Sequence, residues 1–244
     1  MKRLLLPALL LAASFAGAAD AAAPAAPAAP ATPETPLLMV GDSMMRLLGV
    51  AMEKQFKKAG VQPATAFSSL GSGLVRPSAF DWTAKIEELI ATNHPKTVFV
   101  ALGTNDRQAI EMNGGSVVKY ESADLWRATY SKCIGGVMDQ LIKGGVTRVV
   151  WMLLPDMNDN ATQEHAQLVN TIIREQAADE TRKDFVTLLD LGTILSKRPG
   201  KFTRYMMDST GKSLTVRDPD GVHLSVDGAK LVAQSILKKY WNKK

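Results

Sequence analysis

Short apolar runs alternate with longer amphipathic stretches along most of this chain, and this alternation constrains the fold more than any other feature. The apolar runs have the length of buried strands and lie at 37–40, 64–67, 97–102, 148–154 and 185–189. The stretches between and after them repeat apolar residues at helical spacing, at 45–59, 82–92, 123–143, 162–178 and 226–241. Strands that alternate with crossover helices predict an α/β fold built on a parallel sheet.

The stretch 123–143 shows the helical pattern most clearly. Trp126, Tyr130, Ile134 and Val137 recur at three- and four-residue steps, which places them on one face of a helix. Cys133, the only cysteine, lies in the same stripe, so we interpret it as a small structural residue of the core and not as a reactive thiol.

Five strands joined by right-handed crossovers predict a flavodoxin-like three-layer αβα sandwich with strand order 2-1-3-4-5. In this order the sheet reverses its winding between strands one and three, and ligands bind beyond the carboxyl ends of those strands. Gly41-Asp42-Ser43 follows the first strand, and Gly103-Thr104-Asn105-Asp106 follows the third. The topology therefore predicts that a candidate nucleophile, Ser43, and an amide donor, Asn105, lie side by side.

Ser43 stands between a buried strand and a helix. At this position the hydroxyl is exposed, and the free N–H groups of the helix N-terminus point at any negative charge that forms nearby. Taken alone, however, Gly-Asp-Ser also fits an ordinary helix N-cap, for which Asp and Ser are both favoured.

A nucleophilic serine needs a base, and the chain has three histidines. His94 precedes a proline in a loop, and His165 begins a polar helix, so we expect both on the solvated surface. His223 follows Asp220 by three residues in a turn-forming segment, where the carboxylate can orient the imidazole and stabilise its protonated form. A surface turn that happens to end in histidine is the alternative.

An acyl-transfer site also needs hydrogen-bond donors for the oxyanion. Asn105 offers a side-chain N–H, and Gly73 or Gly71 offers a backbone N–H with no Cβ to obstruct a substrate. The segment 68–73 also fits a flexible loop after the second strand. Its glycines do not match a dinucleotide-binding fingerprint, because no third glycine follows at position 76 and the segment does not follow the first strand.

Together these blocks resemble the SGNH (GDSL-like) hydrolase family, whose motifs run in the order Gly-Asp-Ser, glycine, Gly-x-Asn-Asp and Asp-x-x-His. All four are present here in that order and span nearly the whole expected domain. The resemblance implies the SGNH hydrolase fold, a catalytic triad of Ser43, His223 and Asp220, and no metal or organic cofactor. It also implies an oxyanion hole formed by the Ser43 amide, the Gly73 amide and the Asn105 side chain.

Further residues are similar to a bacterial branch of this family that is often found beside membrane-bound O-acyltransferases. They are Ser72-Gly73-Leu74-Val75-Arg76-Pro77, Phe80-Asp81-Trp82, and Trp126 with Tyr130. This likeness favours Gly73 over Gly71 as the oxyanion donor, and it implies an envelope acyltransferase as a partner. Met44 departs from the leucine that is usual after the serine, a change that conserves volume.

The N-terminus has the three parts of a secretory signal peptide, which we assign to residues 1–21. Lys2 and Arg3 precede an apolar run from Leu4 to Phe15, which is shorter than the roughly 20 residues that cross a bilayer, and small residues follow. Residues 22–36 are almost wholly alanine and proline and predict a linker, so the folded domain is expected at 37–244. A periplasmic or secreted protein that does not span the membrane after processing is the expectation.

The balance of charged residues argues against nucleic acid as a binding partner. The chain has 244 residues, 46% hydrophobic and 22% charged, as an ordinary globular domain does. Without Lys2 and Arg3, 27 basic residues stand against 24 acidic ones, an excess too small to indicate nucleic-acid binding. The C-terminal lysines fit a solvated helix end.

The function expected from these residues is hydrolysis of O-acyl, mainly O-acetyl, esters on a small molecule or on an envelope or extracellular polysaccharide. A polysaccharide O-acetyltransferase with the same triad, and a silent carbohydrate-binding protein that keeps the fold, are the alternatives. The segment 108–121 is expected to form a loop over the pocket. Acyl chain length, acceptor and oligomeric state are left open by the residues.

Overall fold

Five parallel strands form the central sheet in the computed structural model, which describes residues 32–198, 200–208 and 210–241. The expected signal peptide at 1–21, and the expected linker as far as residue 31, lie outside the described residues. The sheet order is β2-β1-β3-β6-β7, which confirms the predicted order 2-1-3-4-5 among the strands of this sheet. The strands are β1 (Leu37–Gly41), β2 (Ala64–Ser68), β3 (Thr97–Ala101), β6 (Arg148–Leu153) and β7 (Val186–Asp190).

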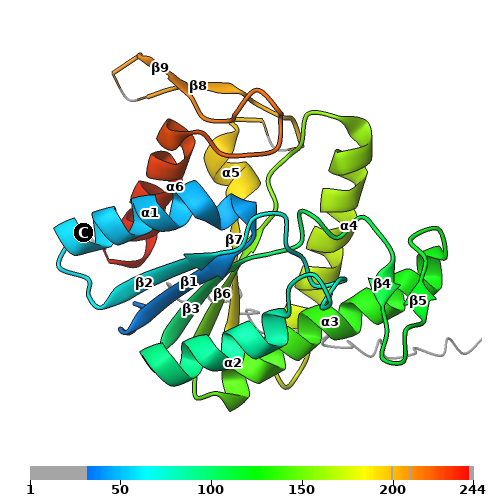
Figure 1. The fold of residues 1–244 in the computed structure, drawn as a ribbon. Helices are drawn as coiled ribbons and strands as arrows, with labels where there is room; N and C mark the ends of the chain where they lie inside the picture. The colour runs from blue at the N-terminus through cyan, green and yellow to red at the C-terminus, as the bar shows by residue number, and fades with distance from the viewer. Residues whose placement is uncertain (1–31, 199, 209, 242–244) are drawn as a thin grey trace, which may run out of the picture. The chain divides into compact units, whose positions relative to one another are not determined.

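Helices cover both faces of this sheet, as Figure 1 shows, and this confirms the predicted three layers. One outer layer contains α1 (Ser43–Lys58), the short α5 (Leu191–Leu195) and α6 (Val226–Tyr240). The other contains α2 (Trp82–Asn93), α3 (Ala123–Lys143) and α4 (Asn160–Ala177). Among the described residues, no helix is both long enough and apolar enough to cross a bilayer.

The central strands are buried along their whole length because both of their faces are covered. In β1 the side chains alternate, so that Leu37 and Met39 enter the core beneath α1 and α6. Leu38 and Val40 enter the core beneath the opposite helices. Both faces of the sheet are thus packed against helices, and the candidate site lies at the carboxyl ends of β1 and β3.

The helix α1 begins at Ser43, two residues before the predicted start at 45. Asp42 caps it, since its carboxylate accepts a hydrogen bond of 2.8 Å from the backbone N–H of Met44. The other predicted helices agree with the observed ones within two residues at each end.

Two hairpins and one short helix were not predicted. The hairpins join β4 (Ile110–Glu111) to β5 (Val117–Val118) and β8 (Tyr205–Met207) to β9 (Ser213–Thr215), and the helix is α5. Strands of two or three residues are too short to show an alternating pattern, so their formation depends on the neighbours they pack against.

Candidate active site

Ser43, His223 and Asp220 lie in one chain of hydrogen-bonding contacts. The Nε2 atom of His223 is 2.7 Å from the hydroxyl oxygen of Ser43, although 180 residues separate the two in sequence. The Nδ1 atom of the same ring is 2.6 Å from Oδ2 of Asp220. The three residues that the sequence analysis selected are therefore brought together by the fold.

The charge state of Asp220 decides how the imidazole is protonated. Slight burial raises the pKa of this carboxyl, but hydrogen bonds from the His223 ring and from the Val222 and His223 amides outweigh burial and lower it to about 2. An ionised carboxylate can only accept, so Nδ1 of His223 must donate. Nε2 is left as the acceptor for the Ser43 hydroxyl, which is the arrangement a general base requires.

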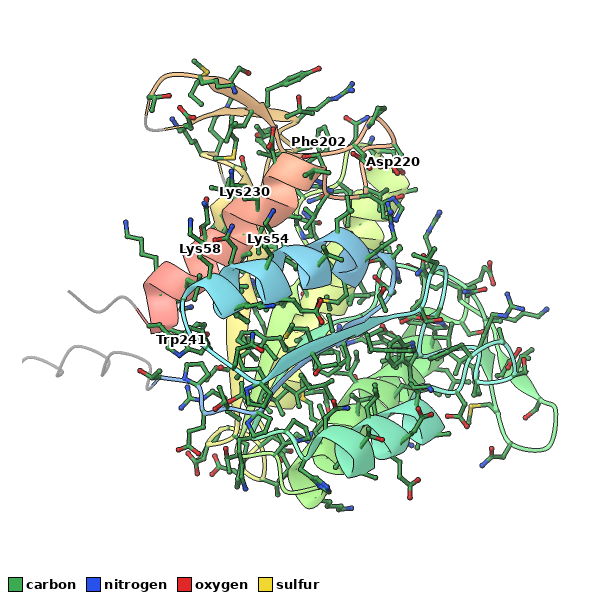
Figure 2. The ribbon with its side chains drawn as sticks, turned by 60° about the vertical axis from the view of Figure 1, so that its left-hand side comes forward. Lys54, Lys58, Phe202, Asp220, Lys230 and Trp241 are labelled. Carbon is green, nitrogen blue, oxygen red and sulfur yellow. The ribbon has the colours of Figure 1, made fainter. Side chains whose placement is uncertain are left out.

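The acid and the base are at the surface. The side chain of Asp220 is 48% exposed and that of His223 is 33% exposed, while Ser43 is half-buried. Figure 2 places Asp220 near the start of α6, away from Trp241 at the other end of that helix. An ester on a large molecule can reach a site this open without first entering an enclosed cavity.

Arg217 holds the turn that carries His223. Its buried guanidinium donates to the carbonyls of Asp156 at 2.7 Å, Gly221 at 3.2 Å and Val222 at 2.8 Å. Burial lowers the pKa of Arg217 to about 10, so the group stays charged at neutral pH. Three carbonyls on one guanidinium fix the turn backbone, a role for Arg217 that its neighbours in sequence do not indicate.

Asp42 links the loop after β1 to the loop after β3. It is fully buried, and while Oδ1 caps α1, Oδ2 accepts a hydrogen bond of 3.2 Å from the backbone N–H of Thr104. Burial raises its pKa to about 7. The loop after β1 is thereby tied to the loop that carries Asn105.

The candidate oxyanion donors come from three neighbouring loops. The Ser43 N–H belongs to the first turn of α1, where no carbonyl of the helix can accept it. Asn105 Nδ2 donates at 2.8 Å to the carbonyl of Ser72, which uses one of its two N–H groups and joins its loop to Gly73. Within the described part of the chain, no hydrogen bond uses the Gly73 amide. Gly71 is exposed and has a φ of +68°.

Gly73 is glycine because Asp106 leaves no room for a side chain. A Cβ at position 73 would overlap Oδ1 of Asp106, which also accepts a hydrogen bond of 3.4 Å from the Val75 amide. Asp106 Oδ2 accepts from the Tyr130 hydroxyl at 2.6 Å, inside the core. Burial raises the pKa of Asp106 to about 6. Asp106, the last residue of the Gly-x-Asn-Asp block, therefore excludes any side chain at position 73, in the loop after β2.

His165 is buried, and our expectation that it lies on the solvated surface is wrong. Its Nε2 donates at 3.1 Å to the carbonyl of Gly103, and its Nδ1 lies 3.3 Å from the Tyr120 hydroxyl. Burial lowers the pKa of the ring to about 4, so it is neutral at pH 7. Through its hydrogen bond to Gly103, His165 supports the loop that carries Asn105 from the core side. His94 is exposed, as expected, and ends α2.

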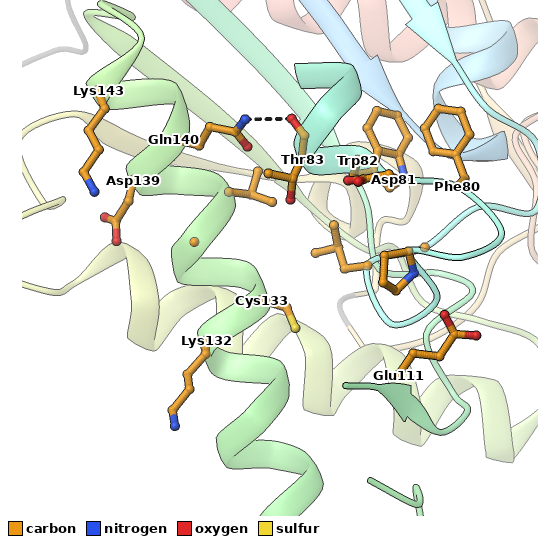
Figure 3. Close-up of a pocket in the computed structure, with 15 residues that line it drawn as sticks. Phe80, Asp81, Trp82, Thr83, Glu111, Lys132, Cys133, Asp139, Gln140 and Lys143 are labelled. Atoms are coloured by element: carbon orange, nitrogen blue, oxygen red, sulfur yellow. Dashed lines mark hydrogen bonds between the residues drawn. The ribbon is translucent and has the colours of Figure 1, made fainter. Parts of the chain in front are cut away.

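A groove of about 570 Å³ shares Gly73 with the candidate site and lies between residues 73–83 and α3 (Figure 3). Its wall includes Leu74, Pro77 and Phe80, and charged side chains border it. Glu111 of β4 also lines it, so the segment 108–121 folds as a hairpin beside this groove. Cys133 lies in the groove wall, half-buried instead of within the core, and burial raises its pKa to about 11.

The part of the chain that the structure describes holds no group of three or more His, Cys, Asp or Glu side chains arranged to bind a metal ion. The arrangement at Ser43 contains instead a nucleophile, a base, an acid and nearby N–H donors. Those are the groups that acyl transfer through a serine ester uses.

Comparison with known families gives one match, to the family described as "Protein of unknown function (DUF459)", over residues 36–239. No curated protein matches the sequence.

Several solved structures share the fold. An acetyl xylan esterase, AlAXEase, is 18% identical with a TM-score of 0.56, and the alignment covers 84% of this chain and 98% of that one. A member of the lipolytic protein G-D-S-L family from Veillonella parvula is 15% identical with a TM-score of 0.53, covering 85% and 98%. An acetyl xylan esterase from Geobacillus stearothermophilus is 14% identical with a TM-score of 0.51, covering 84% and 94%. At these identities the likeness establishes the fold, which is that of the GDSL-type, or SGNH, hydrolases.

Proposed function

This chain belongs to the family described as a protein of unknown function, DUF459, and from that premise, together with its GDSL-type fold, we propose that it is a serine esterase that hydrolyses O-acyl esters. The observation that carries the proposal is the contact chain from Ser43 through His223 to Asp220, with distances of 2.7 and 2.6 Å. Each contact has the length of a strong hydrogen bond, and the Asp220 carboxyl, whose pKa is lowered to about 2, is ionised at neutral pH.

In the proposed reaction, Ser43 Oγ attacks the ester carbonyl carbon while His223 Nε2 takes the hydroxyl proton. The tetrahedral intermediate collapses, the C–O bond to the alcohol breaks, and the imidazolium returns the proton to the departing oxygen. Water then attacks the acyl-Ser43 ester, again giving its proton to His223, and the acid is released as serine is regenerated. Asp220 stabilises the imidazolium in both halves.

The negative oxygen of the intermediate is assigned to the N–H groups of Ser43, Gly73 and Asn105. The loops that carry them are held by the contacts of Asp42 with Thr104 and of Asn105 with Ser72. Each donor of this kind contributes about 3 kcal/mol of transition-state stabilisation. Fixing the three loops to one another keeps the donors in place before the substrate arrives.

The substrate we propose is an acetylated polysaccharide of the cell envelope or the exterior. The surface-exposed acid and base support a large substrate, and the groove beside Gly73 offers the apolar faces and polar rim that sugar rings contact. Two of the solved structures with this fold are named acetyl xylan esterases. Export through the segment 1–21, and an envelope acyltransferase as partner, belong to the same proposal.

The test is hydrolysis of a chromogenic acetate ester and of an acetylated polysaccharide by the purified protein. Ser43→Ala is expected to lower kcat by at least about 10³-fold, as loss of a triad nucleophile does. Ser131→Ala, a matched change on α3, is expected to keep the wild-type rate. Wild-type activity in Ser43→Ala would disprove the nucleophile, and acetylated sugar in place of free acetate would identify a transferase.

A further inference from the structure

One outer layer of the sandwich carries a large excess of positive charge. The layer that comprises α1, α6 and the segment 197–215, here called the cationic layer, contains 12 basic and three acidic residues. All other positions between 32 and 241 together contain 13 basic and 20 acidic residues. A formal charge of +9 on one side thus stands against −7 on the remainder, a separation that the small net charge of the chain conceals.

An apolar groove runs along the cationic layer between α1 and α6. Its volume is about 460 Å³, and no acidic side chain lines it. Figure 2 shows three lysines along this pair of helices, Lys54 and Lys58 on α1 and Lys230 on α6. Among the apolar side chains of the groove, Val50 is 62% exposed and Val226 is 69% exposed. Large apolar side chains that face water within a basic rim mark an interaction surface.

The β8–β9 hairpin extends the same combination of side chains beyond α6, and Figure 2 shows it projecting past that helix. Tyr205 and Met207 are 56% and 53% exposed. Basic residues are frequent in the same segment: Lys197, Arg198, Lys201, Arg204 and Lys212. Exposed apolar and basic side chains therefore occur together on three elements of one layer.

We propose that the cationic layer docks the protein on a bilayer that contains anionic phospholipid. A phospholipid surface offers phosphate groups to the lysines and acyl chains to the valine, methionine and tyrosine side chains. It can therefore bind both the basic and the apolar side chains of this layer. An anionic polysaccharide would match the lysines but would leave Val50, Val226 and Met207 in contact with polar groups.

The position of Ser43 relates this surface to the candidate site. Ser43, Leu47, Val50, Lys54 and Lys58 follow one another at three- and four-residue steps, so they share one face of α1. The groove accordingly begins one helical turn from the serine. Docking through this layer brings the ester-cleaving site to the edge of the bilayer contact.

The experiment is sedimentation of the full chain with vesicles of phosphatidylcholine alone or mixed with phosphatidylglycerol. Every variant keeps the same N-terminus, so any contribution of the apolar segment 4–15 is constant. Binding is expected only to the anionic vesicles and is expected to weaken as salt rises. The variant Lys54→Glu/Lys58→Glu/Lys230→Glu is expected to bind at least about 100-fold less, since each lysine near an anionic surface contributes about a fivefold factor and each new glutamate is repelled by it.

A matched control makes the same change of charge on the other layer. Lys119→Glu/Lys132→Glu/Lys143→Glu alters exposed residues outside the cationic layer and is expected to bind within about threefold of wild type. Val50→Asn/Val226→Asn is expected to lose about tenfold, and Leu125→Asn/Val117→Asn is expected to lose nothing. Thermal unfolding near that of wild type shows that each variant is folded.

Four outcomes would overturn the proposal. One is equal binding to neutral and anionic vesicles, and another is an equal loss in the two triple-lysine variants. The third is capture by a soluble anionic polysaccharide or an acidic protein without any binding to vesicles. Persistence of vesicle binding in Lys54→Glu/Lys58→Glu/Lys230→Glu would also overturn it, because the N-terminal segment would then be the anchor. None of these outcomes bears on hydrolysis of a soluble ester, so the proposed function is tested separately.

Discussion

The hydroxyl of Tyr130 lies 2.6 Å from Oδ2 of Asp106, within the core at the carboxyl end of β3. The contact connects the long helix α3 to the Asn105 loop, and through Asp106 it reaches Gly73. A residue of the core stripe on α3 is thus in contact with the acidic residue that shapes the candidate oxyanion hole.

Tyr130→Phe is expected to lower the free energy of unfolding by about 1–3 kcal/mol, because it leaves Asp106 Oδ2 buried without its donor. Burial raises the folded-state pKa of Asp106 from the ordinary 3.8 to about 6. The stabilising contribution of this carboxyl is therefore fully present below about pH 4 and is lost as pH rises through about 6. Denaturant unfolding at pH 5 and pH 8 should show the larger effect of Tyr130→Phe at pH 8. Tyr205→Phe, an exposed control, should show no effect at either pH.

Gly73→Ala is expected to reduce stability by about 1–3 kcal/mol, because the new methyl overlaps Asp106 and one of the two must move. Activity should fall as well, since the loop carries a proposed oxyanion donor. Gly136→Ala on α3 is the control. Its added Cβ meets nothing within 4 Å, and the change should raise stability by about 0.5–1 kcal/mol. Equal effects of the two changes in thermal unfolding would contradict this account of Gly73.

Asp220→Asn is expected to lower kcat for a soluble acetate ester by about 10³- to 10⁴-fold with little change in KM. The amide can donate to Nδ1, so the imidazole adopts the wrong tautomer and Nε2 no longer accepts from Ser43. Asp218→Asn, in the same turn, should stay within about threefold of the wild-type rate. A loss of similar size in both variants would mean that the turn, not the carboxylate of Asp220, is what matters.

Arg217→Lys is expected to lower kcat at least about tenfold while KM changes little, because one ammonium cannot reach the three carbonyls that the guanidinium binds. Arg217 acts on His223 through the turn and does not touch the reacting atoms, so it is a positioning residue. The melting temperature should fall too. Arg198→Lys, at an exposed arginine, should match wild type in both measurements.

His165→Gln is expected to change how stability depends on pH. Burial lowers the folded-state pKa of His165 from 6.5 to about 4, so its stabilising contribution is present above about pH 6.5 and is lost as pH falls toward 4. This loss amounts to about 3 kcal/mol in wild type. Glutamine does not titrate, so unfolding curves from pH 4 to 7 should show a smaller fall for the variant. His94→Gln, at an exposed position, is the control. A fall in stability from pH 7 to 4 that is equally small in both variants would contradict the role of His165.

The five-stranded sheet and the five long helices could be predicted, because long periodic segments indicate directly which faces are buried. That Ser43 and the Asn105 loop share one edge of the sheet was also predictable, since the carboxyl ends of parallel strands meet there. The pairing of His223 with Ser43 was predicted by elimination among the three histidines and by the family resemblance. The burial of His165 could not be, because its immediate neighbours in sequence are polar and its partners, Gly103 and Tyr120, come from distant loops. The burial of Arg217 could not be predicted for a similar reason, because this residue adjoins a turn whose composition indicates solvent exposure. The excess of basic residues in the cationic layer was visible only after the fold assigned each residue to a layer.

The site draws its nucleophile from the first helix and its base from the turn before the last one, and α1 and α6 lie side by side (Figure 1). During synthesis, a chain that has not yet produced Asp220 and His223 has neither acid nor base beside Ser43. On the proposed mechanism, hydrolytic capacity therefore arises only at the end of synthesis, when the last helix joins the first, and an incomplete chain cannot cleave an ester through Ser43.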